Sequence, residues 1–338
     1  MFLLCIGGTE LSKVPGLSAA GANPELVPFT APADADLIRF GRPKVVDGVP
    51  LDPEGHPSPA LITRAAVLEA DIPICVVRAG SYIPPTPPYI ELGAGFGKDP
   101  RLEPAVPDGV EIFERAQEFA RAFGRHHQSI MIAESIPGGT TTALLILRAL
   151  GYREMVSSAG PQNPTALKEA VWNRASERIG IRPGDLAQDP LRALTELGDP
   201  MQGAVAGLVM GLPPETEVIL AGGTQMLAVA ALVRALGATR KPLVATTKYV
   251  QGDGSSGFNA LARTLGLETW IAPLDFSKVP YQGLSDYERG YVKEGAGAGG
   301  SVLYAERAGV GVERIIARTT ELYAEMIKTG TEAVSGKQ

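Results

Sequence analysis

A glutamate, a glycine turn and a run of threonines separate a buried-strand pattern from a helical pattern. The residues concerned are Glu134, Gly138, Gly139, Thr140 and Thr141. Glycines let the backbone approach a ligand, and the free N–H groups and dipole at a helix start favour an anion such as phosphate. The chain has no GxxxxGK[ST] loop, so ATP hydrolysis is not indicated. The pattern is also typical of an ordinary capped helix after a tight turn, and this segment alone leaves both interpretations open.

A second glutamate stands at the start of a glycine-rich loop that leads into another helical pattern. Glu294 is followed by Gly295 and Gly297, and further glycines come before Ser301. An isolated glutamate is usually a solvent-exposed ion-pair partner of little consequence. Here the glycines remove side chains from around the carboxylate and leave room for a substrate. This setting favours a functional role for Glu294.

Glycine turns also follow two other apolar runs. Gly222 and Gly223, with Thr224 after them, follow the run that ends at Ala221, and Gly7-Gly8 follows the first apolar run of the chain. In doubly wound folds, ligands bind outside the carboxyl ends of the strands. We therefore expect the glycine turns to meet at one shared cleft.

The composition is that of a well-packed enzyme. The 338 residues are 45% hydrophobic and 20% charged, and 40 glycines and 28 prolines are spread along the chain. The net charge is -6 and no cluster of Lys and Arg occurs, so we expect no nucleic-acid partner and no membrane. No apolar stretch approaches the ~20 residues that span a bilayer. The apolar start is too short for a signal peptide, and we expect a cytoplasmic protein.

The cysteines and histidines form no recognisable metal or redox motif. Cys5 and Cys75 lie inside apolar runs, which favours reduced core thiols over a disulfide. His56, His126 and His127 have no partner at zinc-ligand spacing. The sequence therefore predicts neither a metal site nor a cofactor.

Short apolar runs alternate with helical patterns, as in parallel sheets that are covered on both faces. We predict an α/β fold with a doubly wound, mostly parallel sheet, helices on both faces and a small helical lobe from the chain ends. The predicted strands are Met1–Ile6, Pro73–Val77, Ser129–Ala133, Glu217–Ala221, Pro242–Thr246 and Glu268–Ala272. The predicted helices are Val110–Phe123, Thr141–Leu150, Pro164–Ile179, Pro190–Met210 and Gln225–Leu236.

The domain prediction assigns residues 1–300 to a large α/β nucleotide-binding domain. Residues 301–338 form a helical C-terminal segment, which we expect to pack with N-terminal residues as the small lobe. The stretch Ser81–Asp108 is rich in proline and glycine and has no sustained period. Loops of this length in compact enzymes are usually functional, so we expect this one to serve the site.

Taken in order, these segments resemble the nicotinate-nucleotide–dimethylbenzimidazole phosphoribosyltransferases, in particular a divergent branch found in archaea and some bacteria. The resemblance covers most of the chain and rests on the order and spacing of the matching segments. They are Glu134 with Pro137–Ala143, Asp189–Gly198 with Ala204–Gly211, Val218–Leu232, and Lys293–Ala298. The last is similar to the family motif Gly-Glu-Gly-x-Gly-Ala, whose glutamate acts as the catalytic base. The resemblance thus assigns that role to Glu294.

The resemblance implies transfer of a ribose phosphate from nicotinate mononucleotide to a benzimidazole-type base. The products are the α-ribazole phosphate of the cobalamin lower ligand and nicotinate. Glu134 is expected to orient substrate by hydrogen bonding, and the turn Gly138–Thr141 to bind the phosphate or the nicotinate carboxylate. The other expected substrate contacts are Ser81, Gly222, Gly223, Thr224, Gly295 and Gly297. The implied partners are these small molecules, including phosphate, and a second copy of the chain in a homodimer.

Departures from the family pattern leave the acceptor base open. Ala221-Gly222 stands where the better-known branch has Asp-Gly, and no histidine follows His127. The stretch Arg78–Pro85, which contains Ser81, differs in most residues from the base-pocket loop of that branch. One alternative is a non-catalytic nucleotide-binding or regulatory protein of the same fold. Another is a phosphoribosyltransferase that uses a different donor or a different base, such as adenine or a phenol.

Overall fold

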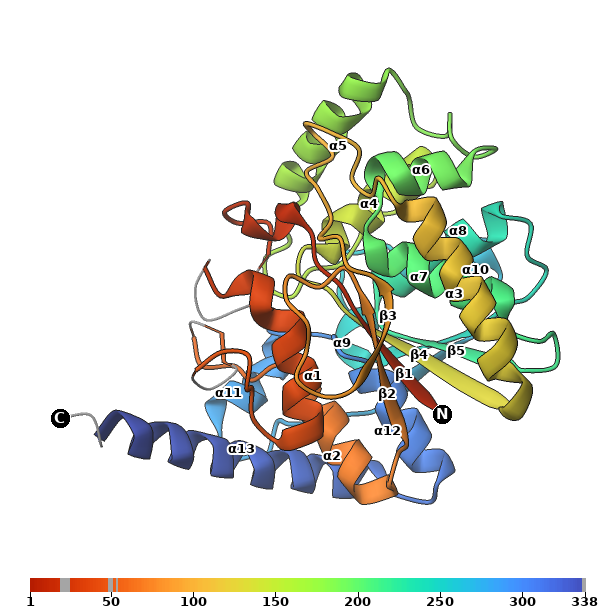
Figure 1. Cartoon of the computed structure of the whole chain (residues 1–338). Helices are drawn as coiled ribbons and strands as arrows, with labels where there is room; N and C mark the ends of the chain where they lie inside the picture. Colours follow the sequence, from red (N-terminus) through yellow and green to blue (C-terminus); the bar gives the residue numbers. More distant parts are fainter. Residues whose placement is uncertain (19–24, 48–50, 53, 336–338) are drawn as a thin grey trace.

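The computed structural model describes residues 1–18, 25–47, 51–52 and 54–335. Its centre is a seven-stranded sheet with the order β3-β2-β1-β4-β5-β6-β7, and every neighbouring pair is parallel (Figure 1). The strands are β1 (Phe2–Ile6), β2 (Ile74–Ala79), β3 (Tyr89–Gly93), β4 (Ser129–Ser135), β5 (Glu217–Ala221), β6 (Leu243–Thr247) and β7 (Thr269–Ala272). The order reverses between β1 and β4, which creates a switch point at their carboxyl ends.

Helices cover both faces of this sheet, and alternate residues of the central strand face the two layers. Leu3 and Cys5 of β1 belong to one buried cluster, whereas Phe2 and Leu4 belong to the other. The first layer contains α3 (Gly109–Phe123), α4 (Gly139–Ala149), α5 (Thr165–Ile179), α6 (Pro190–Leu197), α7 (Pro200–Gly211), α8 (Thr224–Ala235) and α10 (Phe258–Leu265). The second contains α1 (Thr30–Phe40), α2 (Ala60–Ala70), α12 (Ala298–Arg307) and α13 (Val312–Ser335). Short helices α9 (Lys248–Gln251) and α11 (Gln282–Ser285) lie in connections. The predicted α/β class, with its doubly wound sheet, is confirmed.

Two details of the predicted elements are wrong. Each predicted strand is present, but β3 lies inside Ser81–Asp108, for which the sequence predicts a loop. This edge strand is short, and the prolines before it and the glycines after it hide its pattern. The predicted helix Pro190–Met210 is divided into α6 and α7 at Gly198-Asp199. Asp199 caps α7 through a capping box with Gln202, and this cap starts a new helix.

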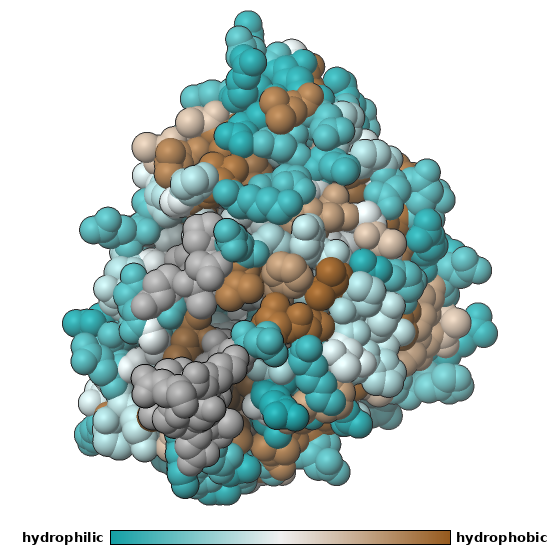
Figure 2. Space-filling view, turned by 60° about the vertical axis from the view of Figure 1, so that its left-hand side comes forward, coloured by the Kyte–Doolittle hydropathy of each residue, from teal (hydrophilic) through white to brown (hydrophobic). Residues whose placement is uncertain are grey.

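The last helices lie on the second layer. Helix α12 packs against β5, β6 and α2, and the long helix α13 crosses the outer side of α2 (Figure 1). None of the helices in the described ranges is long and apolar enough to cross a membrane. Figure 2 shows one face of the molecule, on which hydrophobic side chains form several patches among hydrophilic ones.

Candidate active site

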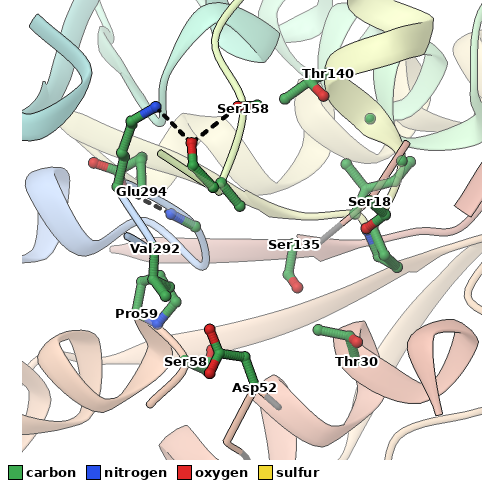
Figure 3. Close-up of a pocket in the computed structure, with 18 of the residues that line it drawn as sticks. Ser18, Thr30, Asp52, Ser58, Pro59, Ser135, Thr140, Ser158, Val292 and Glu294 are labelled. Atoms are coloured by element: carbon green, nitrogen blue, oxygen red, sulfur yellow. Dashed lines mark hydrogen bonds between the residues drawn. The ribbon is translucent and has the colours of Figure 1, made fainter. Parts of the chain in front are cut away.

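A cleft of about 420 Å³ opens at the carboxyl ends of β4 and β5. The sequence-predicted residues that line it are Glu134, Gly138, Gly139, Thr140, Gly223, Thr224, Glu294 and Gly295. Figure 3 shows Thr140 and Ser158 on one side, Ser58 and Asp52 on the opposite side, and Ser135 between them. Residues that are distant in the sequence are thus brought together beside the β1/β4 switch point.

The carboxylate of Glu294 is held by donors from β6, from its own loop and from the start of α12. The backbone N–H of Thr247 donates to Oε2 at 3.0 Å, and the Thr246 hydroxyl lies 3.4 Å from the same oxygen. The N–H of Gly295 donates to Oε1 at 3.2 Å, and the N–H of Gly299 lies 3.2 Å from both oxygens. These bonds fix the orientation of the carboxylate at the edge of the cleft.

Glu134 also lines the cleft, and it is only 2% exposed. It projects from β4, and Gln225 Nε2 donates to its Oε2 at 3.2 Å. Gly222 lies beside it, since a Cβ there would come within 3.3 Å of Glu134 Oε1. Gly222 does not line the cleft, and its lack of a side chain leaves room for the Glu134 carboxyl group.

The pKa values of Glu294 and Glu134 are both higher than that of an ordinary glutamate. Burial raises the pKa of Glu294 to about 7, although the backbone N–H groups around it favour the charged form. Burial raises the pKa of Glu134 well above its usual range, and the negative charge of Glu294 raises it further. Glu294 can therefore gain or lose a proton near neutral pH, while Glu134 is biased toward the protonated form.

The glycine turn before α4 brings the start of that helix to the cleft wall. Gly138 adopts φ 83°, and a Cβ there would lie 2.9 Å from the backbone nitrogen of Ser12, so this position requires glycine. Thr140 faces the cleft, whereas Thr141 is fully buried and does not line it. The Thr142 hydroxyl donates to the carboxylate of Asp199. Of the threonines in this turn, Thr140 is thus the one placed to meet a ligand.

Three other residues in glycine turns and loops do not line the cleft. Ser81 is buried and accepts a hydrogen bond from Arg78 Nε at 3.1 Å, while its hydroxyl donates to the carbonyl of Ile83 at 2.7 Å. Gly297 packs against side chains of β4 and β1, where a Cβ would lie 2.5 Å from Ala133 Cβ and 2.8 Å from the Phe2 ring. Gly7 packs against the backbone of β2. These positions shape the surroundings of the cleft.

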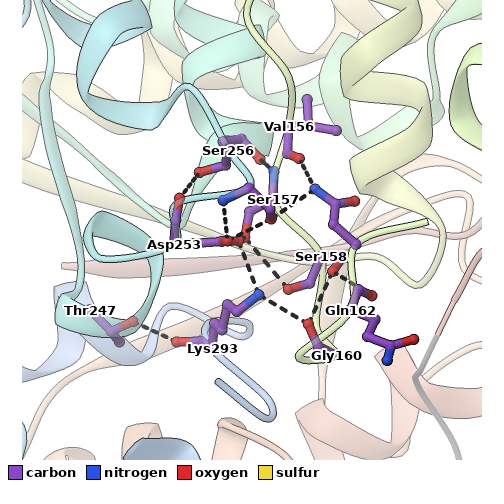
Figure 4. Close-up of polar contacts among 12 residues, drawn as sticks. Val156, Ser157, Ser158, Gly160, Gln162, Thr247, Asp253, Ser256 and Lys293 are labelled. Atoms are coloured by element: carbon purple, nitrogen blue, oxygen red, sulfur yellow. Dashed lines mark hydrogen bonds and ion pairs between the residues drawn. The ribbon is translucent and has the colours of Figure 1, made fainter. Parts of the chain in front are cut away.

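An ion-pair network that the sequence did not reveal anchors the Glu294 loop (Figure 4). Lys293 Nζ lies 2.9 Å from Asp253 Oδ2 and donates to the carbonyl of Gly160 at 3.0 Å. The Ser157 hydroxyl donates to the same Asp253 oxygen at 2.7 Å. The Thr247 hydroxyl donates to the carbonyl of Lys293. The network connects the cleft wall at 157–160 to the residue that precedes Glu294.

A further polar cluster lies on the side of the cleft that faces Thr140 and Ser158. His56 Nδ1 lies 2.6 Å from Asp52 Oδ2, and His56 Nε2 lies 2.9 Å from Asp286 Oδ2. Burial lowers the pKa of His56, but the bonds with Asp286 and Asp52 outweigh it and raise the pKa above its usual value. Asp52, Glu54 and His56 also place three possible metal-ligating atoms within 4.8 Å of one another. Both ring nitrogens of His56 already face carboxylates, so this group is best described as an ion-pair cluster.

No protein-family model matches the chain. Two crystal structures from Thermus thermophilus share its fold. One, titled as a nicotinate-nucleotide–dimethylbenzimidazole phosphoribosyltransferase, has a TM-score of 0.58 and 17% identity, and the match covers 95% of this chain and 82% of that one. The other, titled CobT, has a TM-score of 0.61 and 18% identity, over 95% of this chain and 83% of that one. The predicted family resemblance is therefore supported at the level of the fold.

Curated proteins of archaea match the chain far more closely. A UPF0284 protein of Pyrococcus furiosus is 47% identical over 329 residues, which cover 97% of this chain and 99% of the relative. UPF0284 proteins of Thermococcus kodakarensis and Saccharolobus solfataricus are 46% and 40% identical, over 97% and 96% of this chain and 98% and 93% of the relatives. The chain belongs to the UPF0284 protein family.

Proposed function

We propose that this protein transfers the ribose phosphate of nicotinate mononucleotide to a benzimidazole-type base and releases nicotinate. The observation that carries the proposal is Glu294, a carboxylate that is fixed by backbone donors and has its pKa raised to about 7 at the edge of a substrate-sized cleft. The shared fold with a structure titled as such a transferase supports it.

The chemistry requires one proton acceptor. One ring nitrogen of the base attacks C1′ of the ribose, and the bond between C1′ and the pyridinium nitrogen breaks. The electron pair of that bond neutralises the pyridinium, so nicotinate leaves without being protonated. The second ring nitrogen of the base loses its N–H proton to Glu294. Because the carboxylate is already oriented by Gly299 and Thr247, it is ready to accept this proton.

The wall opposite Ser58 and Asp52 suits the anionic end of the donor. It contains the start of α4 at Gly139-Thr140 and the start of α8 at Gly223-Thr224. Helix N-termini favour phosphate through their N–H groups and dipole. We assign the phosphate or the nicotinate carboxylate to this wall.

The rate should depend on pH through Glu294. A general base acts in its ionised form, so kcat/KM should fall about tenfold per pH unit below its pKa and reach a plateau above it. With the pKa of Glu294 raised to about 7, the midpoint should lie near pH 7 rather than at the usual value for a glutamate. A kcat/KM profile with its midpoint at the ordinary pKa of a glutamate, about 4, would contradict this assignment.

Turnover should survive chelation of metal ions. The leaving group is nicotinate and no pyrophosphate departs, so no step is assigned to Mg²⁺. The test follows nicotinate release from nicotinate mononucleotide, with and without a base, in the presence of EDTA. We expect release that depends on the base and is unchanged by EDTA. Loss of turnover in EDTA that Mg²⁺ restores would indicate a diphosphate donor. Tight donor binding without release under any condition would favour the non-catalytic alternative.

A further inference from the structure

A buried carboxyl group outside the predicted motifs faces the cleft from α1. Asp34 is only 4% exposed and lines the cleft together with Ser58 and Ser135. The Ser58 hydroxyl donates to Asp34 Oδ1 at 2.6 Å, and the Ser135 hydroxyl donates to Oδ2 at 2.7 Å. These two bonds orient the carboxyl group, and they use the only hydrogen that each serine hydroxyl can donate.

The cluster therefore offers a ligand only acceptor atoms. Each oxygen of an ionised carboxylate has a further lone pair after accepting one hydrogen bond. Burial raises the pKa of Asp34 to about 6, with the two serine bonds acting in the opposite direction, so the group is mostly ionised at neutral pH. A ligand atom that reaches this cluster must bring a donor hydrogen, because a methyl group would leave the carboxylate buried without a further partner.

The Asp34 cluster is joined to the Glu294 loop through Pro59 and through α2. Pro59, the neighbour of Ser58, packs on that loop, since a Cβ at Gly295 would come within 3.5 Å of the Pro59 ring. The Thr63 hydroxyl donates to the carbonyl of Ala296 at 2.9 Å, which joins α2 to the same loop. Thr140, on the wall assigned to the anionic end of the donor, lies across the cleft from Ser58 (Figure 3). Since Asp34 and Glu294 line the same cleft, we assign the free edge of a base that reaches Glu294 to the Asp34 cluster.

We propose that Asp34, oriented by Ser58 and Ser135, selects an acceptor base with an O–H or N–H donor on its edge. Hydroxy- or amino-substituted benzimidazoles and aminopurines belong to this class, whereas dimethylbenzimidazole does not. The inference rests on the proposed function and specifies its acceptor. A site that hydrogen-bonds a substrate O–H or N–H discriminates strongly against analogues without it, because its own polar groups would stay unpaired.

The test compares a hydroxy-substituted with a methyl-substituted benzimidazole on the wild-type protein, by nicotinate release and by equilibrium binding. We expect kcat/KM and affinity to favour the hydroxy compound by about 10–100-fold. Asp34→Asn should remove most of this preference, since the amide presents a donor to the ligand. Asp47→Asn, which removes a charge from an exposed cleft residue, should affect both bases alike and leave the preference intact.

The outcomes separate the inference from the proposed function. Turnover of both bases at equal efficiency, or a preference for the methyl compound, would overturn the role of Asp34 and leave the transferase activity standing. An equal loss for both bases in Asp34→Asn would overturn it as well, because the cluster would then bind the ribose hydroxyls of the donor. An Asp34-dependent binding preference without any nicotinate release would support the inference and refute the transferase activity.

Discussion

Replacing Glu294 by glutamine is expected to lower kcat by about 10²–10⁴-fold, the usual contribution of a general base. Glutamine keeps the size of the side chain but cannot accept the N–H proton of the acceptor base. Donor affinity should change little, because Glu294 is assigned to the acceptor. Steady-state kinetics at saturating substrates, with calorimetric binding of nicotinate mononucleotide, would measure both quantities.

Glu134→Gln provides the matched control for this variant. Glu134 is assigned to substrate orientation by hydrogen bonding and not to proton transfer, and an amide does not reproduce the hydrogen bonds of the carboxyl group. We expect this variant to weaken substrate binding at least as much as it slows turnover. A near-normal kcat in Glu294→Gln would show that another group is the base, and Glu134 would be the next candidate.

Gly299→Ala is expected to reduce both stability and activity. A Cβ at this position of α12 would lie 2.3 Å from the Thr246 carbonyl carbon and 2.5 Å from its Cα. Both atoms belong to the backbone of β6, so the helix and the strand must move apart. Overpacking of this kind lowers the free energy of unfolding by about 1–3 kcal/mol. Because the clash is with backbone atoms, which cannot rotate away as a side chain can, we expect a loss near the upper end of this range. The displaced Gly299 N–H would also lose its bonds to Glu294.

Gly254→Ala is the control for the glycine substitution, because a Cβ there would meet nothing within 4 Å. Its unfolding free energy should stay within about 0.5 kcal/mol of the wild-type value. Denaturant unfolding and kcat of both variants would test the difference. If Gly299→Ala were as stable and as active as Gly254→Ala, the close packing of α12 on β6 would not position Glu294.

The sequence could predict the parts of the cleft that follow directly from strand ends. Glu134 and Gly223 stand at the carboxyl ends of β4 and β5, and parallel strands bring such ends to one edge of the sheet. The Glu294 loop precedes α12, which packs against β5 and β6, so its glycines were a usable signal. The sequence alone could therefore assign these residues to one cleft without the order of the strands.

Other parts depended on tertiary contacts that local patterns do not contain. Asp34 and Ser58 come from the opposite layer, and their approach to Ser135 depends on how α1 packs against the sheet. The signal in the sequence was a pair of aspartates, Asp34 and Asp36, among the alanines at the start of a helix. Thr140 faces the cleft and Thr141 does not, a difference set by how α4 is rotated against its neighbours.

The most direct test of the account is the structure of Glu294→Gln crystals grown with nicotinate mononucleotide and a benzimidazole-type base. The slow variant should retain both substrates. We predict the donor phosphate or nicotinate carboxylate at the starts of α4 and α8, and a base nitrogen within hydrogen-bond distance of residue 294. Ligands bound at the opposite edge of the sheet, or a base remote from residue 294, would contradict the account.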